Sequence, residues 1–197
     1  MDRLYTHESH AYEAVKGLQG LEIPRYYGSY SISLPISPGS QQNREVRMIL
    51  IEFINGPSMG DIWGKEKEVS QQARRRMMRM IIDLETRIFE QNVKLEDLAP
   101  RNVMLVGPVE QAGVVFVDFG DVLLKLCRAN SVTEVESRYL GQYVSPLLRW
   151  VHSPPSEFFR MVGWDWQSWV EREFANTEST ITPEMRKDWD NEGIEME

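Results

Sequence analysis

The chain has 197 residues, 42% of them hydrophobic and 26% charged, and its formal net charge is −8. This length suits one compact domain with or without a tail, and the acidic balance argues against nucleic acid as a partner. The single cysteine, Cys127, excludes an internal disulfide and predicts a cytoplasmic protein, and no stretch approaches the roughly 20 apolar residues of a membrane-spanning helix.

The first part of the chain predicts a helix followed by a β-hairpin. The first 15 residues contain no long apolar run, so no secretory signal is expected. Residues 7–20 place apolar side chains at a helical spacing. Residues 27–34 alternate loosely, and residues 46–54 form a nearly continuous apolar run that predicts a buried strand. The composition of residues 37–45 is typical of a loop and joins the two strands into a hairpin.

The next segment predicts a break and then the clearest helix in the chain. Residues 55–61, NGPSMGD, separate a small N-terminal part from a helical remainder. Residues 70–93 carry apolar side chains at steps of three and four, with Ser70 as the expected N-cap. The helix also carries four arginines: Arg74, Arg75, Arg76 and Arg79. A phosphate or membrane patch is one interpretation of them, but the acidic balance of the whole chain favours a solvated face.

The rest of the chain predicts a second hairpin and further helices. Two short apolar strands, 103–106 and 114–120, are joined by a turn with glycine at each end. Helical segments are expected within 121–151 and 156–174, where clustered aromatic residues predict core packing. The polar and acidic segment 176–197 is expected to be a mobile tail.

Three polar residues have the order that phosphoryl transfer requires: Asp97, Asn102 and Asp118. This chemistry needs positioning and charge neutralisation from the protein. Asp118, which follows a strand, can ligate magnesium, and Asn102 offers a carbonyl oxygen to the same ion. Asp97 can hold an attacking hydroxyl and accept its proton. The alternative is that both aspartates are turn or cap residues, but the flanking helix and hairpin favour the catalytic interpretation.

Four segments of the chain resemble the protein-kinase-like superfamily: AYEAVKGLQGLEIPRYYGSY, ILIEFINGPSM, DLAPRNVML and VDFGD. More narrowly, they are similar to kinase-like proteins of filamentous fungi that are related to aminoglycoside phosphotransferases and protein kinases. The resemblance, which covers roughly residues 8–170, implies an α+β fold of the protein-kinase-like type. A reduced small lobe of a helix and a β-hairpin (1–54) is expected on a mainly helical large lobe with a catalytic-type loop (55–175), before the tail.

The resemblance also implies roles for the three polar residues and for their ligands. Asp97 matches the catalytic aspartate of the family, and Asn102 and Asp118 match its two metal ligands. Mg²⁺ and ATP are the cofactors that follow from this match. The expected partners are therefore a nucleotide and a hydroxyl-bearing acceptor, with neither nucleic acid nor a membrane.

In the small lobe, the resemblance implies two nucleotide-binding features. Glu8 matches the acidic residue that pairs with the nucleotide-binding lysine, and Glu13 is a nearby alternative. Residues 51–54, IEFI, match the linker between the lobes, whose backbone holds the adenine. Glu52 and Ile54 are therefore expected in the nucleotide site.

The sequence departs from the family at several points. Leu95 and Glu96 stand where the family has His-Arg or His-Gly, which removes a brace of the loop and a partner for a phosphorylated activation loop. No lysine or glycine-rich turn precedes Glu8, so a shortened small lobe is expected. By analogy with the loss of one preorganised hydrogen-bond donor, the absence of this cation is expected to cost roughly 2.7–4 kcal/mol of transition-state stabilisation. Three hypotheses remain: a phosphotransferase, a catalytically inactive binding or scaffold protein, and a shortened form of a longer kinase-like protein.

Overall fold

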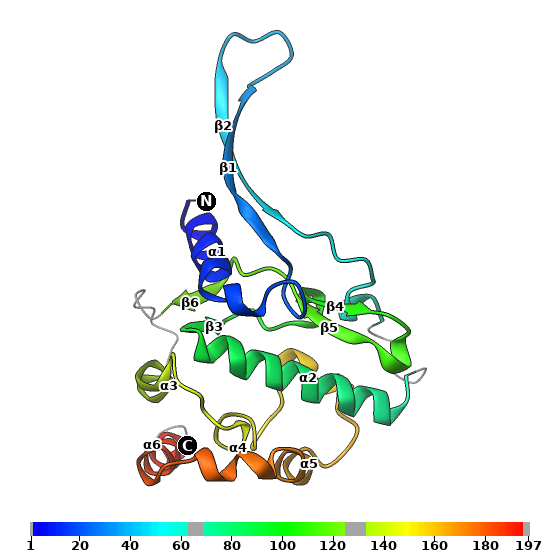
Figure 1. Cartoon of the computed structure of the whole chain (residues 1–197), viewed down its shortest axis with the longest axis vertical. Coiled ribbons are helices and arrows are strands. Elements are labelled where there is room, and N and C mark those ends of the chain that lie inside the picture. Colours follow the sequence, from blue (N-terminus) through cyan, green and yellow to red (C-terminus); the bar gives the residue numbers. More distant parts are fainter. Residues whose placement is uncertain (1, 63–68, 125–132, 195–197) are drawn as a thin grey trace.

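The computed structural model describes residues 2–62, 69–124 and 133–194, and Cys127 lies outside these ranges (Figure 1). Within them, three two-stranded antiparallel sheets accompany the helices. A long β-hairpin and a helix form one end of the molecule, one long helix lies across the middle, and the C-terminal helices gather toward the other end (Figure 1). The predicted α+β fold, with a helix and a hairpin on a mainly helical larger part, is therefore confirmed.

The N-terminal end of the molecule consists of one helix and one hairpin. The two strands pair antiparallel with Ile32 opposite Val46, so the predicted hairpin forms. The helix lies beside the base of the hairpin, where the ring of Tyr12 stacks on that of Tyr26 at 5.3 Å between centroids. The elements are α1 (Asp2–Ala14), η1 (Lys16–Leu18), β1 (Tyr26–Pro35) and β2 (Asn43–Ile51).

The prediction that the second strand is buried is wrong. The outer part of the hairpin projects away from the other elements (Figure 1), and its large apolar side chains are exposed. For example, Leu34 near the tip is 40% exposed, and Leu50 of the second strand is 48% exposed even near the base, on the face that is not covered. A continuous apolar run signals burial only where other layers cover both faces of the strand, and here the described chain supplies cover only near the base.

Helix α2 (Gln71–Glu90) organises the main core. As predicted, Ser70 caps it, accepting a hydrogen bond from the backbone N–H of Ala73 at 3.1 Å. Its predicted apolar face is confirmed: Met77, Ile81 and others lie fully buried in the main core cluster. Burying each such side chain contributes about 1.5–3 kcal/mol. This packing makes α2 the fixed element against which the loops that follow it are positioned.

A buried ion pair ties α2 to the C-terminal helices. The carboxylate of Glu85 accepts hydrogen bonds from both terminal nitrogens of Arg149, at 2.7 and 2.8 Å, and their side chains are only 3% and 4% exposed. The Trp150 indole N–H donates to the same carboxylate at 3.2 Å, and the Arg149 guanidinium lies 3.9 Å from the centre of the Phe89 ring. These contacts offset part of the hydration that both charges lose on burial; the Nε of Arg149 has no hydrogen-bond partner among the described residues.

Two short sheets follow α2 and frame the predicted catalytic loop. β3 pairs with β6, and β4 pairs with β5. The second strand of the predicted hairpin ends at Phe116 rather than at residue 120, because Asp118 takes a φ of 65° and leaves the ladder. The elements are η2 (Met59–Ile62), β3 (Val93–Leu95), η4 (Pro100–Asn102), β4 (Val103–Val106), η5 (Val109–Gln111), β5 (Gly113–Phe116) and β6 (Val122–Leu124).

The C-terminal part consists of short helices, of which α3, α4, α5 and α6 lie below α2 in Figure 1. They are α3 (Glu134–Tyr139), α4 (Pro146–Arg149), η6 (Ser156–Met161), α5 (Trp166–Glu173), η7 (Ala175–Thr180) and α6 (Pro183–Ile194). Among the described residues, none of the helices combines the length and the apolar character needed to cross a bilayer.

The segment expected to be a mobile tail contains helix α6, which packs on α3. Met185 is buried, and the ring of Trp189 lies 5.1 Å from that of Tyr139. Asp188 accepts hydrogen bonds from Arg138 at 2.6 Å and from Tyr139 at 2.8 Å. Met185 and Trp189 are four residues apart and share one helix face, which explains how an otherwise polar segment docks.

Candidate active site

The two motifs of the candidate site are tied together by strand pairing. β3 leads into the loop that begins at Asp97, and β6 follows the Asp-Phe-Gly segment. The two strands pair with Leu95 opposite Val122, and the backbone N–H of Glu96 donates to the carbonyl of Asp121 at 3.2 Å. Backbone hydrogen bonds at Leu95 and Glu96 therefore hold the start of the loop in place. These are the positions where the family has a histidine whose side chain supports the loop.

Within the loop, the structure brings Asp97 and Asn102 into direct contact. The Asn102 side-chain N–H₂ donates to the Asp97 carboxylate at 2.9 Å and to the Asp97 backbone carbonyl at 3.1 Å. Pro100 starts the single turn η4 that returns the chain to Asp97. The amide oxygen of Asn102 accepts no hydrogen bond from the described residues, so it is available to a cation.

Asp118 lines the same small cavity as Asp97 and Asn102. The cavity measures about 10 Å³, close to the smallest volume that holds one water. The backbone N–H of Val117 donates to the carbonyl of Asn102 at 2.9 Å, which fixes the two segments relative to each other. The exposed Asp118 carboxylate accepts one hydrogen bond, from the backbone N–H of Gly120 at 3.1 Å. The three predicted residues thus meet around one cavity.

Glu8 faces this site from α1, whereas the alternative, Glu13, is exposed. Burial raises the pKa of Glu8, the negative charge of Asp118 raises it further, and a hydrogen bond from the backbone N–H of Phe119 lowers it. Glu8 and Asp118 therefore repel each other. No positive charge from the described residues lowers the pKa of Glu8. The resemblance, by contrast, predicts a lysine paired with this residue.

Tyr12 is a residue of the site that sequence reasoning missed. It is fully buried between the rings of Tyr26 and Phe119, and its centroid lies 5.0 Å from that of Phe119. Its hydroxyl has no hydrogen-bond partner in the described structure. Burial raises the pKa of Tyr12, and the charges of Glu8 and Asp118 raise it further. The available signal was its spacing of four residues from Glu8 on the same helix.

Arg101 and Glu157 were also missed. The guanidinium of Arg101 pairs with the carboxylate of Asp97 on one side and with Glu157 of η6 on the other, at 3.1 Å. One oxygen of Asp97 therefore contacts Arg101, and the other contacts Asn102. The position of Arg101 four residues after Asp97 was visible in the sequence, but its link to Glu157 depends on the tertiary fold.

Glu52 and Ile54 lie in the linker after the hairpin and do not line the cavity around Asp97. The Glu52 carboxylate accepts the backbone N–H of Arg25 at 3.1 Å, so this side chain stays within the hairpin base. Further along, the backbone N–H of Leu105 donates to the carbonyl of Pro57 at 2.9 Å, which holds the linker against β4.

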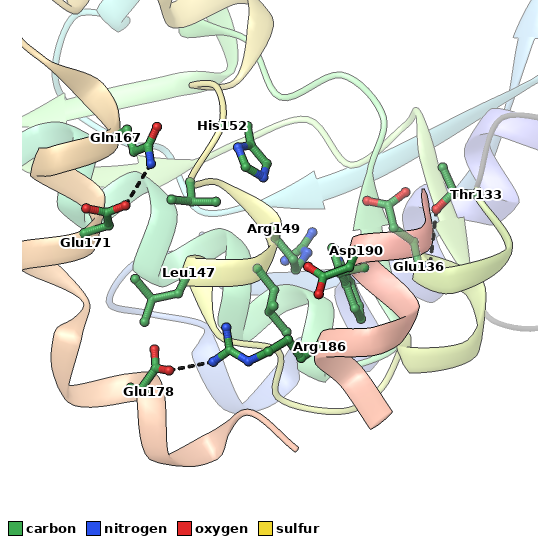
Figure 2. A pocket seen from close by; sticks show the side chains of 13 residues that line it. Thr133, Glu136, Leu147, Arg149, His152, Gln167, Glu171, Glu178, Arg186 and Asp190 are labelled. Carbon is green, nitrogen blue, oxygen red and sulfur yellow. Dashed lines mark hydrogen bonds and ion pairs between the residues drawn. The ribbon is translucent and has the colours of Figure 1, made fainter. Parts of the chain in front are cut away.

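A larger cavity of about 670 Å³ lies among α3, α4, α5 and α6, away from the predicted site residues (Figure 2). Its polar side chains largely contact one another. Arg186 pairs with Glu178 at 2.5 Å, and Gln167 donates to Glu171 at 2.9 Å (Figure 2). We assign this cavity no part in the chemistry of the loop.

The residues around Asp118 fit a magnesium ion. A carboxylate oxygen from Asp118 and an amide oxygen from Asn102 are ligands of the type that Mg²⁺ takes alongside phosphate oxygens and water. A cation there would also offset the repulsion between Glu8 and Asp118. In the described ranges, this site included, no group of three or more histidine, cysteine, aspartate or glutamate side chains is arranged to hold a metal, so the candidate ligands here are one carboxylate and one amide.

Comparison with solved structures finds kinase domains at low similarity. The chain is 20% identical to Rad53 1–466 in complex with AMP-PNP, with a TM-score of 0.49, over 96% of this chain and 46% of that one. It is 19% identical to the Rad53 kinase domain and SCD2, with a TM-score of 0.48, over 92% and 66% of the two chains. The chain thus spans less than half of the first of these structures. No family model matches it, and no curated protein matches its sequence.

Proposed function

We propose that the chain carries the phosphoryl-transfer site of a kinase-like phosphotransferase that uses Mg²⁺ and ATP on a hydroxyl-bearing acceptor. The observation that carries this proposal is the direct contact of Asp97 with Asn102, at 2.9 Å, beside a cavity that Asp118 also lines. Phosphoryl transfer needs a base or orienting group and a metal-binding pair in proximity, and these residues supply both.

In this proposal each residue has a distinct task. Asp118 and the amide oxygen of Asn102 would hold the metal, which would supply charge neutralisation for the phosphates. Asp97 orients the acceptor hydroxyl and takes its proton. Arg101 keeps one Asp97 oxygen in a fixed direction through its second contact, with Glu157. The backbone at Glu52 and Ile54 is the proposed adenine contact.

A second candidate function is nucleotide binding without turnover. The observation that favours it is Glu8, whose carboxylate faces Asp118 and receives no compensating positive charge from the described residues. A metal–nucleotide complex is held by such a site, but transfer lacks a cation that neutralises the phosphates as charge develops.

Calorimetric titration of the full chain with ATP and MgCl₂ tests both functions, together with a turnover assay over a broad set of hydroxyl acceptors. We expect Asp118→Ala to abolish Mg²⁺-dependent binding. Asp97→Asn should retain binding but lose turnover. Asp121→Ala is the matched control, because its exposed carboxylate lies three residues beyond Asp118; it should retain both properties.

The outcomes separate the two functions. Binding that depends on Asp118, together with turnover that depends on Asp97, supports the phosphotransferase. Binding that depends on Asp118 without turnover supports the second candidate. No Mg²⁺-dependent ATP binding in the wild type contradicts both.

A further inference from the structure

One face of α2 presents a row of hydrogen-bond donors that shares no lining residue with the cavity around Asp97. Gln72, Arg75, Arg76 and Arg79 are separated by three and four residues, so they lie on one face of the helix. Sequence reasoning favoured a solvated face for these arginines. Arg76 and Arg79 are exposed, as expected for a solvated face, and Arg75 is half-buried. Each of the three also contacts a neighbouring group, and the charge of that group determines whether the positive charge of the arginine is compensated.

The arginines are positioned mainly by groups that carry no negative charge. Arg75 lies over the ring of Trp164, with its guanidinium carbon 5.3 Å from the ring centroid. Arg76 donates to the backbone carbonyl of Ala112 at 2.8 Å. In the described ranges neither forms an ion pair with a carboxylate within 4 Å. A carbonyl or an indole fixes a guanidinium in space and leaves its charge available.

Arg79 differs, because it pairs with Glu173 of α5 at 2.9 Å and more loosely with Asp83 at 3.7 Å. The charge of this arginine is therefore already compensated. Glu173 is also the one carboxylate that lines the cavity between α2 and α5. Because its charge is already paired with Arg79, it does little to compensate the charges of Arg75 and Arg76.

These side chains line a cavity of about 380 Å³ between α2 and α5. A cavity of this size accommodates a small ligand. Its α2 wall carries the three guanidinium groups and the side-chain amides of Gln71 and Gln72, and its α5 wall carries Trp169 and Glu173. A positively charged cavity in a chain with a net charge of −8 is a local feature that the bulk composition does not explain.

We propose that this cavity binds the phosphate group of a small organic phosphate. Arginine forks match phosphate oxygens in pairs, and Arg75 and Arg76 supply two such forks that neighbouring groups hold in position. Gln72 adds an uncharged donor, and Trp169, which is 2% exposed, gives the cavity a small apolar surface for the organic part. The site shares no residue with the cavity around Asp97, so it does not depend on the function proposed above.

Titration calorimetry of the full chain with phenyl phosphate and with inorganic phosphate tests the proposal. The Asp118→Ala background should be used, so that phosphate binding at the nucleotide site is disabled and the two proposals fail independently. We expect saturable binding of phenyl phosphate. Arg75→Gln and Arg76→Gln should each weaken it by about tenfold or more, as expected for loss of a charge-assisted contact. Arg44→Gln, at an exposed arginine of β2, should not change it.

Glu173→Gln gives a test in the opposite direction. It removes the carboxylate that compensates Arg79, so binding should become tighter. Tighter binding of phenyl phosphate than of inorganic phosphate identifies an organic phosphate as the ligand, and equal binding shifts the assignment to the free ion and overturns the organic part of the proposal. Absence of saturable binding, or equal weakening by Arg44→Gln, overturns the site itself. Thermal unfolding of each variant separates lost binding from lost folding.

Discussion

At the scale of single residues, the candidate site is dominated by carboxylates that face each other. Glu8 is partly buried and lies close enough to Asp118 to be affected by its charge. The folded-state pKa of Glu8 therefore lies above its value in the unfolded chain. Its favourable contribution to folding is fully present below the unfolded pKa and is lost as the pH rises through the folded pKa.

This sign gives a testable prediction for Glu8→Gln. The neutral amide keeps a hydrogen-bond acceptor for Phe119 but never ionises, so the variant should become more stable than the wild type as the pH rises from about 4 to about 8. Thermal unfolding across that range measures the difference; for a chain of this size about 1 kcal/mol corresponds to about 2–4 °C. Saturating MgCl₂ should reduce the advantage if the cation offsets the repulsion. An advantage that is the same at every pH would show that Glu8 is not charged against Asp118.

A second prediction concerns the buried pair of Glu85 and Arg149. Arg149→Ala leaves a carboxylate without its partner in a site that is almost fully buried, so the free energy of unfolding should fall by about 3–5 kcal/mol. Arg79→Ala is the control on α2, the helix that carries Glu85, because the Arg79 side chain is 45% exposed and its ion pair with Glu173 should contribute at most about 1 kcal/mol. Urea unfolding measures both values. Equal losses in the free energy of unfolding would mean that the buried pair stabilises the fold no more than the exposed one.

The residues that were predicted from the sequence lie close together in the chain, whereas the pair that was missed lies far apart in it. Asp97, Asn102 and Asp118 lie within one short segment, and their spacing with the flanking strands indicates a loop. Arg149 is separated from Glu85 by most of the helical part, and no local pattern pairs them. Where the burial of a side chain or the pairing of two side chains depends on long-range packing, a single sequence contains no local pattern that predicts it.

At the scale of elements, the hairpin shows what a hydrophobic pattern does not reveal. The apolar run of β2 correctly predicts a strand, but burial of a strand depends on layers from other parts of the chain. The capped helix α2 was predicted correctly because its cap and its periodic apolar face are both local signals. For α6, two apolar residues at positions 185 and 189 are enough to dock it, and the polar composition of that segment concealed this.

The exposure of the hairpin leads to a third prediction. Leu34→Thr replaces an exposed leucine by a β-branched residue suited to strands, and we expect a loss of less than about 0.5 kcal/mol. Leu84→Ala, on the buried face of α2, should cost about 2–5 kcal/mol. Chemical denaturation of the two variants provides the comparison. A loss for Leu34→Thr close to that for Leu84→Ala would show that the hairpin is covered in solution.

At the scale of the whole molecule, the question is whether the N-terminal part and the helical part unfold together. The sequence predicts a division near residue 54, with a small lobe before it and a larger one after it. In the structure, however, Val15 of the N-terminal part belongs to the same core cluster as Met77 of α2 and Trp169 of α5. A shared core of this kind favours a single cooperative transition.

The prediction that tests this coupling uses the distribution of tryptophans. All six lie at residue 63 or beyond, so their fluorescence reports only on the larger part. Val15→Ala removes buried methyl groups just after the C-terminal end of α1 and should lower the free energy of unfolding by roughly 2 kcal/mol. If the core is one unit, this loss lowers the urea midpoint seen by tryptophan fluorescence as much as the midpoint seen by far-UV circular dichroism. If the fluorescence midpoint stays at the wild-type value while the dichroism transition broadens, the two parts unfold independently, and α1 would then be free to shift Glu8 relative to Asp118 without disturbing the helical part.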